Sequence, residues 1–159
     1  ANAGNVPESE DPIKVTIQDW TGQHFSTYVT VGLLKEMGYN VEIVVSDAIT
    51  QHPAIAAGNI HLTSEVWTNN LGDLYTGLVE KGDIVVVGEL GLEPKEGWIY
   101  PPYMKDKCPG LPSYKALYDC AMAFGSAETF PKGRLVTYPA SWGTRSRDIV
   151  SSIEFDIAI

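Results

Sequence analysis

Three of the four tryptophans follow segments that are expected to be β-strands, and each lies beside turn-forming residues. Trp20 follows the run IKVTIQ, Trp67 closes IHLTSEVW, and Trp142 lies in the loop PASWGT. A single tryptophan in such a place is more often a core residue, but three are harder to assign to packing. Indole faces attract cations that cannot donate hydrogen bonds, above all a quaternary ammonium. The spacing therefore indicates an aromatic site for a methylated cation.

The loop around Trp142 combines two features that such a ligand needs. A carboxylate on the same ligand requires backbone N–H donors, which are most accessible at a helix N-terminus. The run Trp142-Gly143-Thr144-Arg145-Ser146 supplies an aromatic face and then a glycine that opens a helix expected from residue 145. This loop is the second part of the candidate site.

Strands and helices alternate along the first half of the chain, and this order predicts a largely parallel sheet with helical crossovers. One helix should bury a face made of Tyr28, Val31, Leu34 and Met37. Strands are expected over 14–18, 41–46, 60–67, 84–89 and 134–138, and helices over 26–37, 49–57, 71–81, 113–123 and from 145 to 150.

The chain divides into three predicted parts. Residues 1–12 read as a flexible tail, either left after removal of a signal peptide or simply a loose N-terminus. Residues 13–93 form a first α/β lobe. After Gly91 the sequence is rich in glycine, proline and aromatic residues, so residues 94–159 are predicted to be a crossing segment and part of a second lobe.

Composition excludes several classes of protein. The 159 residues include 20 acidic and 11 basic side chains, a formal net charge of −9, which argues against nucleic acid as a partner. No apolar run is long enough for a transmembrane helix. An apolar fraction of 44% with 19% charged residues is typical of a globular protein.

Cys108 and Cys120 are the only cysteines, and they enclose a stretch with Pro109, Gly110 and Pro112. They are either a local disulfide or two unrelated buried thiols. The turn residues between them favour the disulfide, which would contribute roughly 3 kcal/mol and implies an oxidising compartment. The spacing has no supporting ligand pair for a metal, so no metal is expected.

An enzyme is not expected. Ser141 lies in PASWG, which is not a G-x-S-x-G nucleophile elbow. His24 stands alone near the end of the first strand, and His52 and His61 belong to no motif. The sequence contains neither a P-loop nor a dinucleotide-binding glycine motif, so no cofactor is expected.

The chain resembles the substrate-binding proteins of ABC transporters for glycine betaine, proline betaine and choline. The resemblance covers roughly residues 13–150, through IKVTIQDWTGQ, LLKEMGYNVEIV, AIAAGNIHLTSEVWTNN, EGWIYPPYMKDKCPGLPSYKALYDC and GRLVTYPASWGTRSRDIV. It implies a two-lobed α/β fold of the periplasmic-binding-protein type II, with parallel-rich sheets and flanking helices. It also implies a periplasmic or extracytoplasmic osmoprotectant-binding protein, with its signal peptide removed, that works with an ABC permease.

The resemblance assigns roles to individual residues. It makes Trp67 and Trp142 walls of an aromatic box, and it adds Trp20 as a further wall beside Asp19, an acidic partner for the cationic head. Other residues have smaller implied roles: Gly143 and Thr144 as backbone N–H donors to a ligand carboxylate, and Trp98 and Tyr100 as weaker wall candidates. Glu65 could add negative charge near the site, but a carboxylate on a strand is expected to face solvent. The cysteine pair matches a pair in one branch of the family, which favours the disulfide.

The chain departs from the family in length, because relatives are nearly twice as long and complete their second lobe after the Trp-Gly loop. We therefore expect an incomplete second lobe with an exposed sheet edge, which favours a homodimer or a domain-swapped assembly. Two alternatives stay open. The same fold could serve as a ligand-sensing module, or the site could take proline or another amino-acid-like zwitterion, with Asp19 as hydrogen-bond acceptor.

Overall fold

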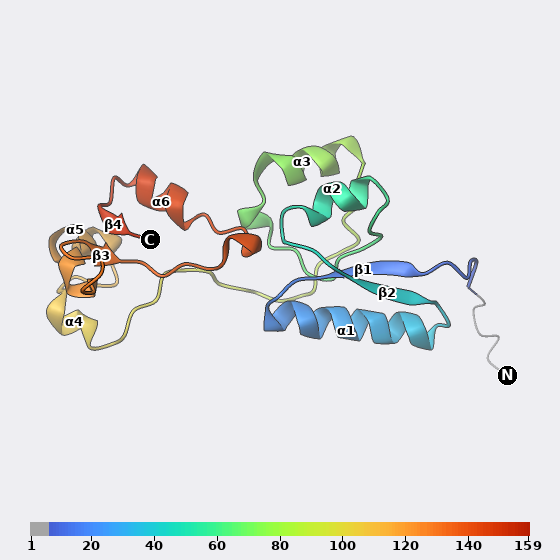
Figure 1. Ribbon diagram of the computed structural model, residues 1–159, viewed down its shortest axis with the longest axis horizontal. Coiled ribbons are helices and arrows are strands. Elements are labelled where there is room, and N and C mark those ends of the chain that lie inside the picture. The colour runs from blue at the N-terminus through green and yellow to red at the C-terminus, as the bar shows by residue number, and fades with distance from the viewer. Residues whose placement is uncertain (1–6) are drawn as a thin grey trace. The chain divides into compact units, whose positions relative to one another are not determined.

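The computed structural model describes residues 7–159, which form two compact units. The first unit runs up to Leu90 and also includes Pro139–Gly143. The second contains Gly91–Tyr138 and Thr144–Ile159. Half of the predicted flexible tail, residues 1–6, lies outside the described residues. Figure 1 follows the chain through both units by colour.

A β-α-β motif forms the centre of the first unit. The parallel strands β1 (Ile13–Ile17) and β2 (Val41–Val45) pair in register from Ile13 opposite Val41 to Ile17 opposite Val45. Helix α1 (Thr21–Glu36) connects them and packs against both. Figure 1 shows α1 on one side of the strand pair, with α2 (Gln51–Ala56) and α3 (Gly72–Lys81) on the other. The short helix η1 (Thr68–Asn70) precedes α3.

Helix α1 differs from its prediction in both its start and its buried face. It begins five residues earlier than expected, and it buries Gln23, Thr27 and Val31. The predicted apolar face is wrong in part: Val31 is buried as expected, but Tyr28 is 58% exposed and Met37 is also exposed. The buried face still has the i, i+4, i+8 spacing of a helix. Two of its three residues are polar, so an apolar pattern could not identify it.

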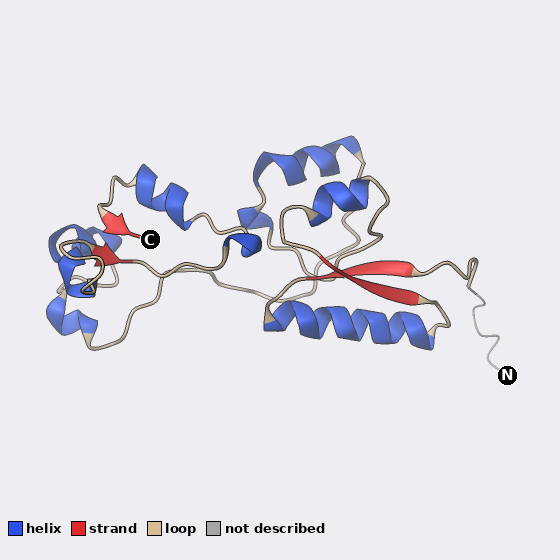
Figure 2. Cartoon of the chain, viewed as in Figure 1, coloured by secondary structure: helices blue, strands red, loops and turns tan. Residues whose placement is uncertain are grey.

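Two predicted strands of the first unit are absent. The segment 60–67 makes only a single bridge, between Leu62 and Val15. The segment 84–89 forms no strand, and Val85 and Val87 are 81% and 99% exposed. Figure 2 draws both segments as loop. A strand needs a neighbouring edge for its N–H and C=O groups. The segment 60–67 bonds to the backbone of β1 through His61 and Leu62, and it continues as loop, so it forms no strand beside which 84–89 could pair.

The second unit consists of short elements. It contains α4 (Met104–Lys107), η2 (Tyr114–Ala116), α5 (Leu117–Cys120), η3 (Ala121–Phe124) and α6 (Ser146–Ser152). The strands β3 (Gly133–Arg134) and β4 (Ile157–Ala158) pair in parallel. The predicted helix over 113–123 is broken into three pieces, and only one residue of the predicted strand over 134–138 is in a strand. Among the described residues of the chain, no helix has the length and apolar character to cross a membrane.

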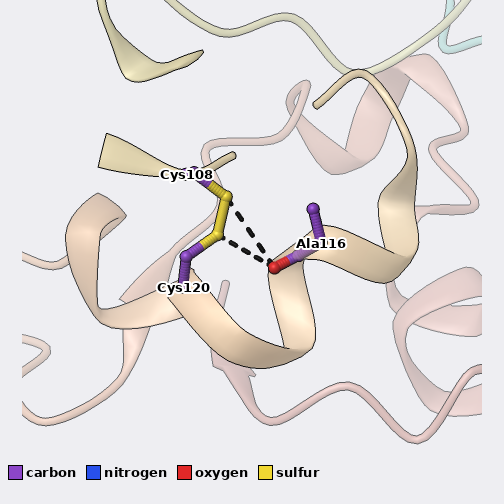
Figure 3. Close-up of a disulfide and its surroundings, with 3 residues drawn as sticks. All are labelled: Cys108, Ala116 and Cys120. Carbon is purple, nitrogen blue, oxygen red and sulfur yellow. Dashed lines mark hydrogen bonds between the residues drawn. A yellow bond between two sulfur atoms is a disulfide. The ribbon is translucent and has the colours of Figure 1, made fainter. Parts of the chain in front are cut away.

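A disulfide joins Cys108 to Cys120, which confirms the pairing predicted from the sequence. Their Cα atoms are 5.4 Å apart, and the bond connects the end of α4 to the end of α5. Figure 3 shows the carbonyl oxygen of Ala116 beside both sulfur atoms, 3.0 Å from Sγ of Cys120. The disulfide therefore fixes the path of the chain through α4, η2 and α5.

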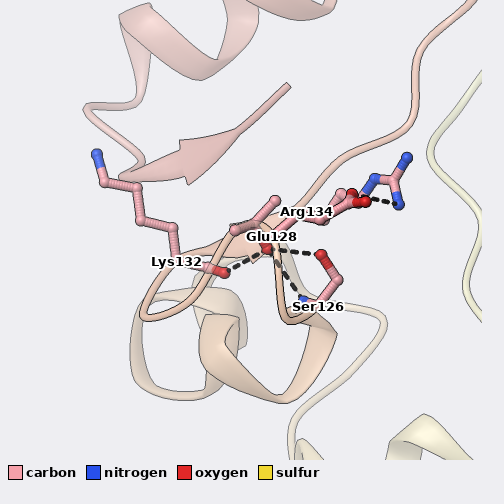
Figure 4. Close-up of polar contacts among 5 residues, drawn as sticks. Ser126, Glu128, Lys132 and Arg134 are labelled. Atoms are coloured by element: carbon pink, nitrogen blue, oxygen red, sulfur yellow. Dashed lines mark hydrogen bonds and ion pairs between the residues drawn. The ribbon is translucent and has the colours of Figure 1, made fainter.

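Polar contacts also order the turn that leads into β3 (Figure 4). Oγ1 of Thr129 accepts the Ser126 N–H at 3.0 Å and donates to the Lys132 carbonyl at 3.0 Å. Glu128 and Arg134 approach to 3.9 Å across the same turn. The Lys132 ammonium forms an ion pair with Asp156 at 2.5 Å. Lys132 directly precedes β3 and Asp156 directly precedes β4, so this pair connects the starts of the two strands. These contacts fix the two short strands beside each other.

Candidate ligand-binding site

The three tryptophans singled out by the sequence all belong to the first unit, and each lies at the end of a helix. Trp20 occupies the N-cap position of α1, and Trp67 occupies that of η1. Trp142 is the last residue of η4 (Ala140–Trp142). All three side chains are half-buried. The prediction that Trp67 closes a strand is wrong, because the segment before it is a loop.

Trp20 and Trp142 form a ring pair. Their ring centroids are 5.5 Å apart and their planes are tilted by 60°. The indole N–H of Trp142 donates to Oδ1 of Asp19, the residue before Trp20. Residues 123 positions apart are thus joined at the end of β1. Asp19 is therefore the partner of an indole edge rather than of an aromatic face.

Glu65 joins Trp20 to Trp67. The indole N–H groups of Trp20 and Trp67 both donate to Oε1 of Glu65, at 2.7 and 2.8 Å. The carboxylate is half-buried, so the expectation that Glu65 faces solvent is wrong. A sequence signal was present, because residues two apart in an extended segment point to the same side. The Glu-x-Trp spacing of Glu65 and Trp67 therefore allows their contact.

The loop that carries Trp142 is anchored to the turn before α2. The N–H of Ala48 donates to the carbonyl of Ser141 at 3.0 Å. Gly143 is buried with a φ of 76°, and a Cβ on it would lie 3.6 Å from the Ile49 side chain. Glycine adopts this left-handed conformation without strain.

Asp47 stabilises the turn before α2 through hydrogen bonds. Its Oδ1 accepts the backbone N–H groups of Ile49 and Thr50 at 2.9 and 2.7 Å, and its Oδ2 accepts the Thr50 hydroxyl at 2.7 Å. Partial burial raises the pKa of Asp47, but the three hydrogen bonds to the charged form outweigh it, and the net pKa is lowered. The ionised carboxylate therefore stabilises the turn that binds the Trp142 loop.

A buried polar network connects the end of β1 with α1 and α2. The Gln18 amide donates to Oε1 of Gln51 at 2.7 Å and to the Thr16 hydroxyl at 3.2 Å. The Thr27 hydroxyl accepts from Gln23 and donates to the Thr16 carbonyl, each at 3.3 Å. The buried Oε1 atoms of Gln18 and Gln23 accept no hydrogen bond among the described residues, so the network is only partly satisfied, but its bonds connect the neighbouring elements. This network fixes the end of β1, and therefore also the start of the segment that carries Asp19 and Trp20.

Three other predicted site residues are less directly connected to this cluster. The Gly143 N–H already donates to the Ala140 carbonyl at 3.1 Å, so a ligand carboxylate would have to compete for it. Thr144 and Trp98 belong to the second unit, and their binding roles remain predictions. The Thr144 hydroxyl accepts the Ser146 N–H at 3.2 Å and so caps the start of α6.

The described residues offer no metal site: among residues 7–159, no group of three or more His, Cys, Asp or Glu side chains could hold an ion. His24 is exposed on α1, with its ring centroid 6.5 Å from that of Tyr28. His52 is 2% exposed and packs edge-on against Tyr75, with centroids 5.0 Å apart. Burial lowers the pKa of His52.

Comparison with known proteins assigns the chain to a family. The chain belongs to the family of substrate-binding domains of ABC-type glycine betaine transport systems, whose family model matches residues 11–156. The resemblance read from the sequence is thereby confirmed. Members of this family bind solutes rather than catalyse reactions, in agreement with the prediction that the chain is not an enzyme.

A curated relative is the trimethylamine N-oxide-binding protein of Pelagibacter ubique (strain HTCC1062). It is 32% identical over 146 residues, which cover 89% of this chain and 46% of the relative. The chain thus spans about half the length of this relative.

Proposed function

We propose that the chain carries the solute-binding site of an extracytoplasmic component of an ABC importer, and that its solute has a trimethylated, positively charged nitrogen. Glycine betaine appears in the family's description, and trimethylamine N-oxide is the ligand named for the relative. Choline has the same trimethylated head. In all three the nitrogen is positively charged and has no N–H to donate, so aromatic faces suit it.

The observation that carries this proposal is the cluster of Trp20, Trp67 and Trp142 in one compact unit, with carboxylates at their indole edges. Each cation–π contact contributes about 0.5–2 kcal/mol. A micromolar dissociation constant corresponds to about −8 kcal/mol, so the remainder must come from further contacts and from preorganisation. Gly143, Thr144 and Trp98 are proposed as sources of those contacts.

The partner and location follow from the same proposal. An importer component of this family works with a membrane permease, and it meets its solute outside the cytoplasm. The disulfide between Cys108 and Cys120 supports that location, because such bonds persist in oxidising compartments. We further propose that the two compact units correspond to the two lobes of a type II binding protein. A homodimer remains a prediction, and sedimentation of the chain at high concentration checks it.

Calorimetric titration of the chain with glycine betaine, trimethylamine N-oxide, choline and proline tests the proposal. We expect saturable binding of at least one trimethylated solute and at least tenfold weaker binding after Trp67→Ala or Trp142→Ala. The control is Phe130→Ala, which removes an aromatic side chain that is 73% exposed in the second unit. If the chain binds proline and none of the trimethylated solutes, its ligand is an amino-acid-like zwitterion rather than a trimethylated solute. Unchanged affinity in both tryptophan variants would move the site elsewhere.

A further inference from the structure

We propose that Glu65 is a positioning residue that fixes the indoles of Trp20 and Trp67 for ligand binding. This inference rests on the proposed function, because it gives these two indoles their role as walls of the site. Its basis is geometric: two indole N–H groups from separate segments converge on a single carboxylate oxygen, Oε1, at 2.7 and 2.8 Å.

The other carboxylate oxygen is held as well. Oε2 of Glu65 accepts the hydroxyl of Ser26, on α1, at 3.2 Å. Gly22, in the first turn of α1, leaves room for the carboxylate, because a Cβ there would lie 3.3 Å from Oε2 and 3.7 Å from the Trp20 ring. The Glu65 side chain is therefore fixed from both oxygens, and it can orient what binds to it. Gly22 and Ser26 are part of the same arrangement.

Fixing an indole by its N–H edge has one main consequence for a cation. It limits the rotation of the ring about its side-chain bonds, so less conformational freedom is lost when the ligand binds. The indole face is then already oriented for a cation–π contact.

A second way for Glu65 to act is direct attraction of the cation by its charge. The two readings are separable because both indoles donate to the same oxygen. In Glu65→Gln the amide oxygen can still accept both N–H groups, and the amide N–H₂ can donate to the Ser26 hydroxyl. The charge is lost but the positioning contacts remain. In Glu65→Ala both are lost.

The experiment measures solute affinity by calorimetry and the indole N–H signals by proton–nitrogen NMR. In Glu65→Ala we expect the signals of Trp20 and Trp67 to shift, that of Trp98 to stay in place, and affinity for the bound trimethylated solute to fall at least tenfold. In Glu65→Gln we expect affinity within about threefold of the unaltered chain. Glu42→Gln and Glu42→Ala are the matched controls, since Glu42 is an exposed carboxylate of β2.

Each other outcome has a definite meaning. Equal loss of affinity in Glu65→Gln and Glu65→Ala would overturn positioning in favour of charge attraction. Unmoved Trp20 and Trp67 signals in Glu65→Ala would remove the structural basis. If Glu65→Ala does not fold, Gly22→Ala decides, because its Cβ crowds Oε2 and should shift the same two signals and weaken binding. If the unaltered chain binds no trimethylated solute but the signals still respond, the ligand proposal fails and the indole–carboxylate contacts stand.

Discussion

Asp19 and Trp142 are joined by a hydrogen bond from the indole N–H to Oδ1, and this bond fastens the loop Pro139–Gly143 to the end of β1. The same loop is fastened a second time, through the Ala48 N–H and the Ser141 carbonyl. Two attachments from different segments give Trp142 a defined place beside Trp20. The loop is therefore part of the first unit, although it lies about 50 residues beyond the rest of that unit in the sequence.

The Asp19–Trp142 bond should appear as a coupling energy. Asp19→Ala and Trp142→Phe each remove the bond, and the double variant removes it only once. We expect a coupling of about 1 kcal/mol in the free energy of unfolding, since a hydrogen bond to a charged group contributes about 1.5–3 kcal/mol and Asp19 is exposed. Denaturant unfolding of the four proteins of the cycle measures it. Additive effects of the two substitutions would show that the bond contributes nothing to stability.

His52 should make stability depend on pH. Burial lowers its pKa in the folded protein, whereas the unfolded chain takes up the proton near the ordinary value of about 6.5. Between these two pKa values the unfolded chain binds more protons, so the free energy of unfolding decreases as the pH falls below about 6.5 and levels off below the folded-state pKa.

Denaturant unfolding at a series of pH values from above to below about 6.5 measures the effect. His52→Gln should flatten the dependence. His24→Gln is the matched control, because it removes a histidine that is exposed on α1. Equal slopes in the unaltered chain and His52→Gln would contradict the prediction.

The disulfide should stabilise the second unit. Closing the loop between Cys108 and Cys120, with a sequence separation of 12, contributes roughly 3 kcal/mol in the chain-entropy model. The double variant Cys108→Ser, Cys120→Ser should be destabilised by about that amount in thermal unfolding. A reductant should destabilise the unaltered chain and have no effect on the double variant. A reductant effect of the same size in both proteins would have another origin.

Gly133 should tolerate no side chain. A Cβ at this position would lie 2.3 Å from the carbonyl oxygen of Ala121, so the backbone of β3 passes too close to η3 for alanine. We expect Gly133→Ala to lower the free energy of unfolding by about 1–3 kcal/mol, the usual cost of overpacking. Gly97→Ala is the matched control, because nothing lies within 4 Å of a Cβ there and its φ is not left-handed. Similar losses in both variants would refute the packing explanation.

The sequence predicted the elements whose signals are local. The strands β1 and β2 are short apolar runs, and α3 ends at Gly82, in the left-handed conformation that glycine adopts readily. The runs 60–67 and 84–89 have the same apolar character and yet form no strands. Strand formation depends on a partner edge from elsewhere in the chain, and no local pattern records whether that edge is present.

The site was predictable in its aromatic residues and less so in their partners. The tryptophans were found because they follow strand-like runs. The sequence predicts a solvent-facing Glu65, because a carboxylate on a strand usually faces water. Its two indole partners, Trp20 and Trp67, become neighbours only when the chain folds. The spacing of Glu65 and Trp67 could indicate their contact, but the contact of Glu65 with Trp20, 45 residues away, could not be predicted from the sequence.

The Trp20–Trp142 ring pair gives the first unit an optical property. Two indoles whose centroids are 5.5 Å apart and whose planes are tilted by 60° have strongly coupled electronic transitions. Such coupling produces a paired positive and negative band in circular dichroism, and its size and sign depend on the distance and angle between the rings. A displacement of the Trp142 loop from the end of β1 would change this band. The protein thus carries its own label-free reporter of the state of that loop.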